Sequence, residues 1–412
     1  MNKSLIDARR ARIGVFGFFV FAGFVMGLWA AGLPSLDERL DLGPGLLGTV
    51  LLLISGGALV SMLAAGPLVD RFGSRRVCWV AGPLSALTLL GPALAPSYAT
   101  LAALAVVFGI GLGACEVAMN AHSVEVERAY GRPIISAFHG TWSLGGAAGG
   151  ALTALFLRVG VDPQLVLVVA AVVVALLYLP AARLLLPSAP ARPEAAPGEA
   201  KAGTGASLTW GLIALLGLAA FAGHLSEGAA IDWAALHARW VLGTDPAAAP
   251  LAYTIFSVAM TTVRLLGDPI RARLGSVRTI QLAGLLATAG YGLVLLSPLA
   301  PEALRVACAW SGWALAGVGL ATVVPVLFSA VGAAGERVGR ALAMVTAFGY
   351  SGMLIGPGVL GYVADVASLP VALIIPAALA AVVSLAGVPA MRSLLRASPP
   401  ASAAPLPEPA RD

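Results

Sequence analysis

Charged residues and cysteines are scarce in this chain. Asp, Glu, Lys and Arg make up 11% of its 412 residues, and hydrophobic residues make up 59%. Ordinary soluble domains have about 25% charged and about 45 to 50% apolar residues, so this composition excludes an ordinary soluble globular protein. The three cysteines, Cys78, Cys115 and Cys308, lie in apolar stretches and give no disulfide framework.

Motifs of ATP-driven pumps and of metalloenzymes are also missing. The only lysines, Lys3 and Lys201, belong to no glycine-rich phosphate loop, which excludes a nucleotide-driven pump. The 4 histidines include no pair with the HExxH spacing of zinc proteases. We therefore expect no enzyme activity, no bound metal and no cofactor.

Long apolar runs are what the sequence does contain. A hydrocarbon layer of about 30 Å requires about 20 apolar residues in a helix, and twelve segments approach this length. They begin near Ile13, Leu46, Val77, Tyr98, Ile134, Gln164, Leu208, Pro250, Val277, Ala303, Ala341 and Pro370. The predicted fold class is an all-α membrane protein with twelve transmembrane helices.

The distribution of positive charge gives the orientation. With an even number of spans, both termini lie on one side of the membrane. That side carries twenty of the 25 Lys and Arg residues against four on the other side. Because loops on the cytoplasmic side carry the excess of these residues, we predict a multi-pass protein of the bacterial cytoplasmic (inner) membrane with both termini in the cytoplasm. The net charge of +5 is then a topology signal, and no nucleic acid is expected as a partner.

The chain divides into two halves that resemble each other. GPLVDRFGSRRV at 66–77 matches DPIRARLGSVRT at 268–279 in five of twelve positions. Parallel six-span repeats of this kind are typical of secondary transporters. We predict a six-helix bundle over 1–186, a Pro-, Ala- and Gly-rich cytoplasmic linker over 187–207, a second six-helix bundle over 208–396 and a disordered cytoplasmic tail over 397–412.

The loop motif at 66–77 resembles the signature of the major facilitator superfamily, and the resemblance covers the whole chain. It rests on Gly66, Asp70, Arg71, Gly73 and Arg76. EVAMNA at 116–121, FHGTWSLG at 138–145 and EGAAIDW at 227–233 further resemble relatives of fucose permease and the YbjJ-type transporters. The resemblance implies two pseudo-symmetric six-helix bundles that rock about a central site, usually driven by a proton gradient.

The signature also has a physical interpretation as a latch. Asp70 is free to accept hydrogen bonds from backbone N–H groups at a nearby helix start, where an anion is favoured. With the resemblance as a guide, the helix start at Arg340 is the candidate, with Arg71 and Arg76 beside it. Such a contact would hold the two halves shut on the cytoplasmic side. The alternative is that these arginines only mark a cytoplasmic loop.

An ionisable residue inside a membrane span costs free energy, so its presence there indicates a functional role. In span 4, Glu116 and Asn120 share one helix face, and the repeat has Val324 and Phe328 in their places. We predict Glu116 as a proton-coupling residue, as the resemblance also implies, together with His139 of span 5. The alternative is a carboxylate tied to Arg128 or His139 for packing alone.

Substrate-binding residues are predicted on both halves: Asn120, Trp142, His224, Glu227, Tyr253 and Trp310. Of these, His224 and Glu227 share one face of span 7 at mid-membrane, and the Trp310 ring either stacks on a solute or packs. Asp232 is predicted at an outer gate or at the interface. Arg264 of span 8 lines up with Tyr253 and Ser257, which would give it a place in the site, but the favoured interpretation is a structural pair with Asp268, four residues on.

The sequence therefore predicts a secondary transporter that moves a small solute by alternating access. Proton-coupled import of a polar metabolite is preferred, proton-driven efflux is the second interpretation, and a membrane sensor or scaffold is an outside alternative. Fucose permease has an acid in its first span, and this chain has none between Ile13 and Leu33, so neither a sugar substrate nor a two-acid mechanism carries over. The expected partners are the solute, protons and the lipid bilayer, and we expect a monomer.

Overall fold

The computed structural model describes residues 3–131, 134–187, 209–332 and 339–397. These residues are almost entirely helical, and no strand occurs among them. The first half contains α1 Lys3–Leu40, α2 Gly43–Phe72, α3 Ser74–Leu87, α4 Leu90–Leu94, α5 Tyr98–Tyr130, α6 Ile135–Arg158 and α7 Pro163–Leu184. The second contains α8 Trp210–Leu236 with the π-helical turn His237–Val241, α9 Ala249–Leu296 with the 3-10 turn Ser297–Leu299, α10 Glu302–Leu320, α11 Val323–Gly332, α12 Gly339–Val366 and α13 Leu369–Ala397.

These helices confirm eleven of the twelve predicted spans, because eleven helical stretches are long and apolar enough to cross a membrane. The remaining predicted span, the fifth, is occupied by α6, a helix that is richer in Gly, Ser and Thr. The predicted third span consists of α3 and α4, and the tenth consists of α10 and α11. One long helix, α9, contains both the eighth and the ninth span.

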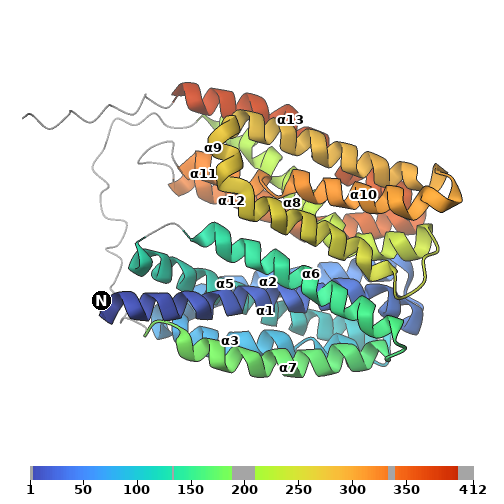
Figure 1. Cartoon of the computed structure of the whole chain (residues 1–412), viewed down its shortest axis with the longest axis horizontal. Helices are drawn as coiled ribbons and strands as arrows, with labels where there is room; N and C mark the ends of the chain where they lie inside the picture. Colours follow the sequence, from blue (N-terminus) through green and yellow to red (C-terminus); the bar gives the residue numbers. More distant parts are fainter. Residues whose placement is uncertain (1–2, 132–133, 188–208, 333–338, 398–412) are drawn as a thin grey trace, which may run out of the picture.

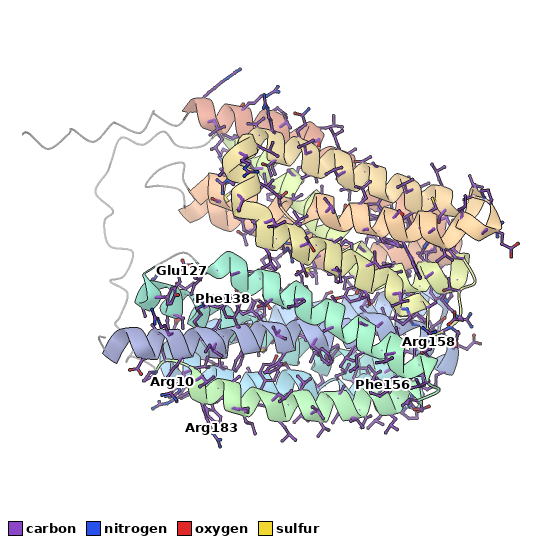
Figure 2. All side chains as sticks on the ribbon, viewed as in Figure 1. Arg10, Glu127, Phe138, Phe156, Arg158 and Arg183 are labelled. Carbon is purple, nitrogen blue, oxygen red and sulfur yellow. The ribbon has the colours of Figure 1, made fainter. Side chains whose placement is uncertain are left out.

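Two helical bundles lie side by side, α1 to α7 in one and α8 to α13 in the other (Figure 1). We call the end where α1 begins and α13 ends the terminal face, and the other end the opposite face. Figure 2 shows Arg10, Glu127 and Arg183 near the terminal face and Arg158 near the opposite face. Large apolar side chains such as Val366, Leu385 and Leu176 are exposed on the outside, as expected for helices that face lipid. The predicted linker and tail lie, apart from their first residues, outside the described residues.

The signature loop and its repeat share one backbone turn. Gly73, between α2 and α3, has φ 83° and ψ 145°. Gly275, which kinks α9 between its two spans, has φ 72° and ψ 159°. Both values lie in a region that is open to glycine and strained for other residues. The duplication predicted from the sequence is therefore present in the backbone as well.

Glycines allow α6 to approach helices on two sides. On one side, a Cβ atom on Gly145 or Gly149 would overlap the backbone of α1, and one on Gly23 of α1 would overlap the Trp142 carbonyl group. On the other side, Gly146 and Gly150 face Tyr253 and Thr254 of α9. Small residues bring membrane helices close in this way. The glycine-rich run of span 5 is therefore a packing device that joins α6 both to its own bundle and to the other one.

Candidate solute site between the two bundles

Polar contacts join the two bundles at the opposite face. The indole N–H of Trp240 donates to Asp37 Oδ2 at 2.9 Å, and Arg239 forms an ion pair with Glu38. The Gly45 amide donates to Asp365 Oδ1 at 3.3 Å, and the Thr49 and Tyr362 hydroxyl oxygens are 3.0 Å apart. We call these eight residues the opposite-face seam. The contacts among these residues close the opposite face. The structure describes one other polar contact between the bundles, the hydrogen bond from Arg264 to Ser143.

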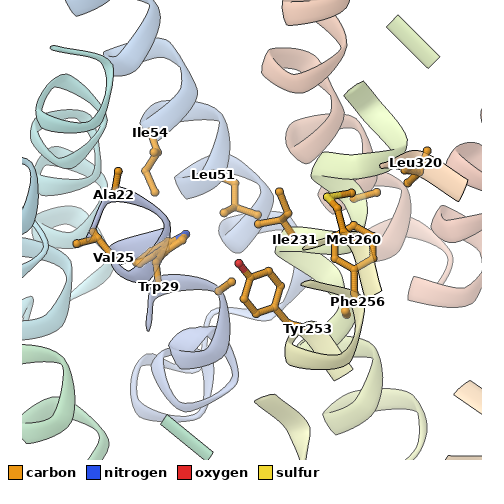
Figure 3. Close-up of a cluster of buried hydrophobic side chains, with 14 of the residues drawn as sticks. Ala22, Val25, Trp29, Leu51, Ile54, Ile231, Tyr253, Phe256, Met260 and Leu320 are labelled. Atoms are coloured by element: carbon orange, nitrogen blue, oxygen red, sulfur yellow. The ribbon is translucent and has the colours of Figure 1, made fainter. Parts of the chain in front are cut away.

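At mid-depth the contact between the bundles is mainly apolar. Tyr253 of α9 is 1% exposed, and a Cβ atom on Gly146 would overlap its hydroxyl oxygen. Figure 3 shows Tyr253 between the bundles, with Trp29 and Leu51 on one side and Ile231 on the other. The predicted substrate contact of Tyr253 thus falls on a side chain that is enclosed in this arrangement.

An ion pair with a third partner occupies the central region beside α6. Arg264 Nη2 donates to Glu227 Oε1 at 2.8 Å, and Arg264 Nη1 donates to Ser143 Oγ at 2.7 Å. Arg264 and Glu227 belong to the second bundle, whereas Ser143 lies on α6 of the first. The sequence favoured a structural pairing of Arg264 with Asp268. The structure instead directs Arg264 to Glu227, and the side chain of Asp268 lies outside the described residues.

His139 lies near this ion pair. Its ring makes an edge contact with Phe19, with ring centroids 5.1 Å apart. The imidazole is within electrostatic range of Arg264 and Glu227. His139 thus lies in the Arg264 cluster, no contact between its ring and Glu116 is found among the described interactions, and proton sharing between these two residues stays a prediction.

Glu116 has an amide as its neighbour and no described cation. Asn120 Nδ2 donates to Glu116 Oε1 and to the Glu116 carbonyl oxygen, both at 2.9 Å. Among the described residues no ion pair includes Glu116, so neither Arg128 nor His139 ties it down. Tyr350 of α12 is within electrostatic range of both Glu116 and Glu227. The two acids thus approach one region from opposite bundles.

The other predicted binding residues divide into two groups. His224 Nδ1 lies 3.0 Å from the Ala220 carbonyl oxygen, and its ring lies 5.4 Å from that of Tyr350, between centroids. Trp142 of α6 is half-buried, one residue before Ser143. His224 therefore lies in the same region as the two acids, whereas the Trp142 side chain is described only as packed against the hydrophobic core. Trp310 of α10 also packs against the hydrophobic core, and its indole N–H is buried with no described partner.

Asp232 lies deeper than an exposed gate residue. It is 8% exposed, and no hydrogen bond or ion pair of its carboxylate is present among the described residues. Tyr253 is within electrostatic range of it. The contacts that close the opposite face come instead from Glu38, Arg239 and the other seam residues, which the sequence analysis did not single out.

The signature residues lie at the terminal face. The structure describes no contact between them and the second bundle. Asp70, Arg71 and Arg76 are exposed, and the Arg71 guanidinium lies over the ring of its neighbour Phe72 at 5.3 Å. Gly66 has open space around its Cα atom. The side chain of Arg340 lies outside the described residues, so the latch stays a prediction.

A structural histidine anchors this loop, and the sequence analysis missed it. His122 is fully buried; its Nε2 accepts from the Leu186 amide at 3.1 Å, and its Nδ1 lies 2.8 Å from Ser74 Oγ. Because Nε2 accepts, the proton of the neutral ring is on Nδ1, which donates to Ser74. The ring thereby connects α5, the start of α3 and the chain that follows α7.

Two six-helix bundles that meet around ionisable side chains at mid-depth define a secondary transporter. The family model of the Major Facilitator Superfamily matches residues 14–334, and the chain belongs to this superfamily. It is 33% identical to an MFS-type transporter of Yersinia pestis over 86% of this chain and 89% of that protein. It is 30% identical to membrane protein MosC of Rhizobium meliloti over 90% of this chain and 88% of that protein.

Solved structures confirm the fold. A mutant of the nucleoside transporter NupG superimposes with a TM-score of 0.71 at 13% identity, covering 93% of this chain and 99% of that one. A D-xylose-proton symporter gives a TM-score of 0.70 at 15% identity over 92% and 97%. A bacterial homolog of the transporter Spinster, solved inward-facing and unoccupied, gives 0.71 at 13% identity over 95% and 98%. The protein is thus a multi-pass membrane transporter and not an enzyme.

Proposed function

We propose that this protein imports a small polar metabolite across the bacterial cytoplasmic membrane together with protons. Glu116 carries this proposal. An ionised carboxylate at bilayer depth needs a partner, a watery cavity or a proton, and the one described partner of Glu116 is the neutral amide of Asn120 at 2.9 Å. The second central acid, Glu227, has Arg264 as a counter-ion. Glu116 is therefore the acid best placed to take up and release a proton.

The residues around the two acids suit a small polar solute. Trp142, His139, His224 and Tyr350 combine aromatic surfaces with hydrogen-bonding groups, as ligand sites generally do. The names of two similar structures, a D-xylose-proton symporter and a nucleoside transporter, agree with a polar substrate and with proton coupling. The motifs at 116–121, 138–145 and 227–233 support a place among the relatives of fucose permease.

The orientation follows from the positive charges. The excess of Lys and Arg on the side of the termini supports a cytoplasmic terminal face, and the predicted linker at 187–207 would join the two six-helix domains on that side. The opposite-face seam then closes the outer end, and the arrangement corresponds to an inward-facing state of a monomer. Efflux receives no separate support, because the glycine-rich run of α6 is accounted for by packing.

The test separates binding from coupling. A thermal-shift screen of the purified protein against metabolites and drugs identifies a ligand, since a ligand that binds the folded state raises its stability. In proteoliposomes, the wild-type protein should then accumulate that solute when a proton gradient is imposed. Glu116→Gln imitates the protonated acid, so it should keep solute binding and solute exchange but lose accumulation driven by the gradient.

A matched control is Glu302→Gln, which removes an exposed carboxylate in the first turn of α10. This variant should accumulate the solute as the wild type does. Full accumulation by Glu116→Gln would remove Glu116 from the coupling mechanism. If the wild-type protein accumulates the solute equally with and without a proton gradient, proton coupling itself is contradicted.

A further inference from the structure

The guanidinium of Arg264 is only partly used by the protein. Of its five N–H groups, one contacts Ser143 and one contacts Glu227 through a single oxygen. The Arg264 and Glu227 side chains are each 12% exposed. Nε of Arg264 has no described acceptor, yet it is not among the fully enclosed unpaired atoms. The ion pair is therefore accessible and leaves donors unused.

The ion pair lies where the two bundles meet, and not inside one bundle as a packing contact would. Arg264 and Glu227 lie on α9 and α8 of the second bundle, but Ser143 lies on α6 of the first, so the cluster bridges surfaces that alternating access must separate. A charge at bilayer depth is costly and is retained chiefly for function. A Cβ atom on Gly140 of α6 would meet Leu265 and the Cβ atom of Arg264. The hydrogen bond to Ser143 brings the guanidinium to the same helix, which also carries His139 and Trp142.

We propose that Arg264 binds the carboxylate of a small organic acid, which replaces Glu227 on the guanidinium. A planar guanidinium and a carboxylate form two parallel hydrogen bonds, more than the single one that Glu227 makes. A neutral or cationic solute would leave Arg264 without an anion whenever Glu227 moved away, and an unpaired buried charge is strongly unfavourable. The inference rests on the proposed function, because it names the substrate class for the same central site.

Displacement of Glu227 couples solute binding to proton binding. Once its counter-ion is taken, the Glu227 carboxylate accepts one proton from the side on which the solute enters. When the solute leaves, Arg264 returns to Glu227, whose proton is released to that side. One carboxylate and the proton on Glu227 cross together, and the proton that Glu116 carries under the proposed function crosses in the same cycle. The titratable and charged groups that face Glu227 from the surrounding helices are Arg264, His139, His224, Tyr253, Tyr291 and Tyr350.

The test uses probes that share a scaffold and differ in charge. Two matched sets are glucuronate, glucose and glucosamine, and benzoate, benzyl alcohol and benzylamine; a panel of short aliphatic acids with their alcohols and amines completes the screen. Binding to the purified full-length protein is measured by thermal shift and then by calorimetry. We expect a carboxylate to stabilise the wild type while its neutral and cationic counterparts do not. If no carboxylate binds, or if only alcohols or amines do, the inference is overturned.

Variants identify the residue responsible. Loss of a charge-assisted hydrogen bond should weaken carboxylate binding by about ten-fold to a hundred-fold in Arg264→Gln. Glu227→Gln removes the anion that competes for Arg264, so this variant should bind the same carboxylate at least as tightly as the wild type. Its affinity should also lack the dependence on protonation that Glu227 gives the wild type. Arg305→Gln, which alters an exposed arginine of α10, is the matched control. A loss of carboxylate binding in Glu227→Gln, or unchanged binding in Arg264→Gln, would refute the inference.

Two further outcomes keep the conclusions separate. If Arg264→Gln does not fold because Glu227 is left unpaired, the double variant Arg264→Gln/Glu227→Gln carries neither charge, and it should fold but still fail to bind the carboxylate. Proton-driven uptake of a neutral or cationic solute by the wild type would refute the inference and leave the proposed function intact. Carboxylate binding at Arg264 without any proton-driven uptake would contradict the proposed function and the coupling step at Glu227, and would leave carboxylate recognition by Arg264 intact.

Discussion

Gly48 of α2 and Gly361 of α12 touch at the opposite-face seam, and a methyl group at either position has no room. A Cβ atom on Gly48 would lie 2.7 Å from Gly361 Cα and 3.2 Å from the Pro357 carbonyl oxygen. One on Gly361 would lie 2.8 Å from the Pro44 carbonyl oxygen. The obstructing atoms belong to the backbone, so no side chain can rotate away. The strain must be relieved by moving the two bundles apart.

The expected effect of Gly48→Ala is a shift between conformations rather than unfolding. Overpacking costs about 1 to 3 kcal/mol, and it is felt only while the seam is closed. A bias of this size changes the ratio of two states by about 5-fold to 150-fold. The population should therefore move toward the state in which the opposite face is open.

A single cysteine at Thr49, with Cys78, Cys115 and Cys308 replaced by serine, reports whether the seam is open. Its labelling by a membrane-impermeant maleimide should be faster in Gly48→Ala than in the parent. The matched control is Gly56→Ala on the same helix, where a Cβ atom would meet nothing within 4 Å; it should leave the labelling rate unchanged. A lower Tm of Gly48→Ala with unchanged labelling would refute the reasoning and reduce the contact to ordinary packing.

Two further predictions concern residues at the terminal face. Asp70→Asn should weaken the predicted latch, so maleimide labelling of the cysteine at position 49 should fall and labelling of cysteines at the terminal face should rise. If neither labelling rate changes, the signature is only a turn between two spans. His122→Phe should leave the Leu186 amide and the Ser74 hydroxyl without their ring partner at a cost of about 1 to 3 kcal/mol, so Tm should fall while transport by the folded fraction persists; a transport defect at unchanged Tm would contradict this structural role.

The spans, the duplication and the local side-chain pair of the site could be predicted because they depend on residues near each other in the chain. Apolar runs give the helices, and Glu116 and Asn120 are four residues apart on α5, so helical geometry alone brings them into contact. The glycine turn at Gly73 recurs at Gly275 because the surrounding motif recurs. These features need no knowledge of how the helices are arranged.

The contacts between helices had no such signal. Arg264 has an acid four residues away, and local spacing favoured Asp268, yet the partner in the structure is Glu227 on another helix. Arg239 and Trp240 reach Glu38 and Asp37 about two hundred positions earlier in the chain. One sequence gives the faces of each helix but not which faces meet. The gate and the ion pair therefore required the folded structure.

The two-sided packing of α6 separates what the helix must conserve from what it can vary. Positions 145, 146, 149 and 150 are restricted to small residues by their neighbours. Trp142, in contrast, meets Gly23 through its carbonyl group, so its ring can be exchanged without disturbing that helix contact. If the proposed site binds the solute, a lineage of such transporters can acquire a new solute preference by substitutions at positions 139 and 142, while the glycine positions that join the bundles stay as they are.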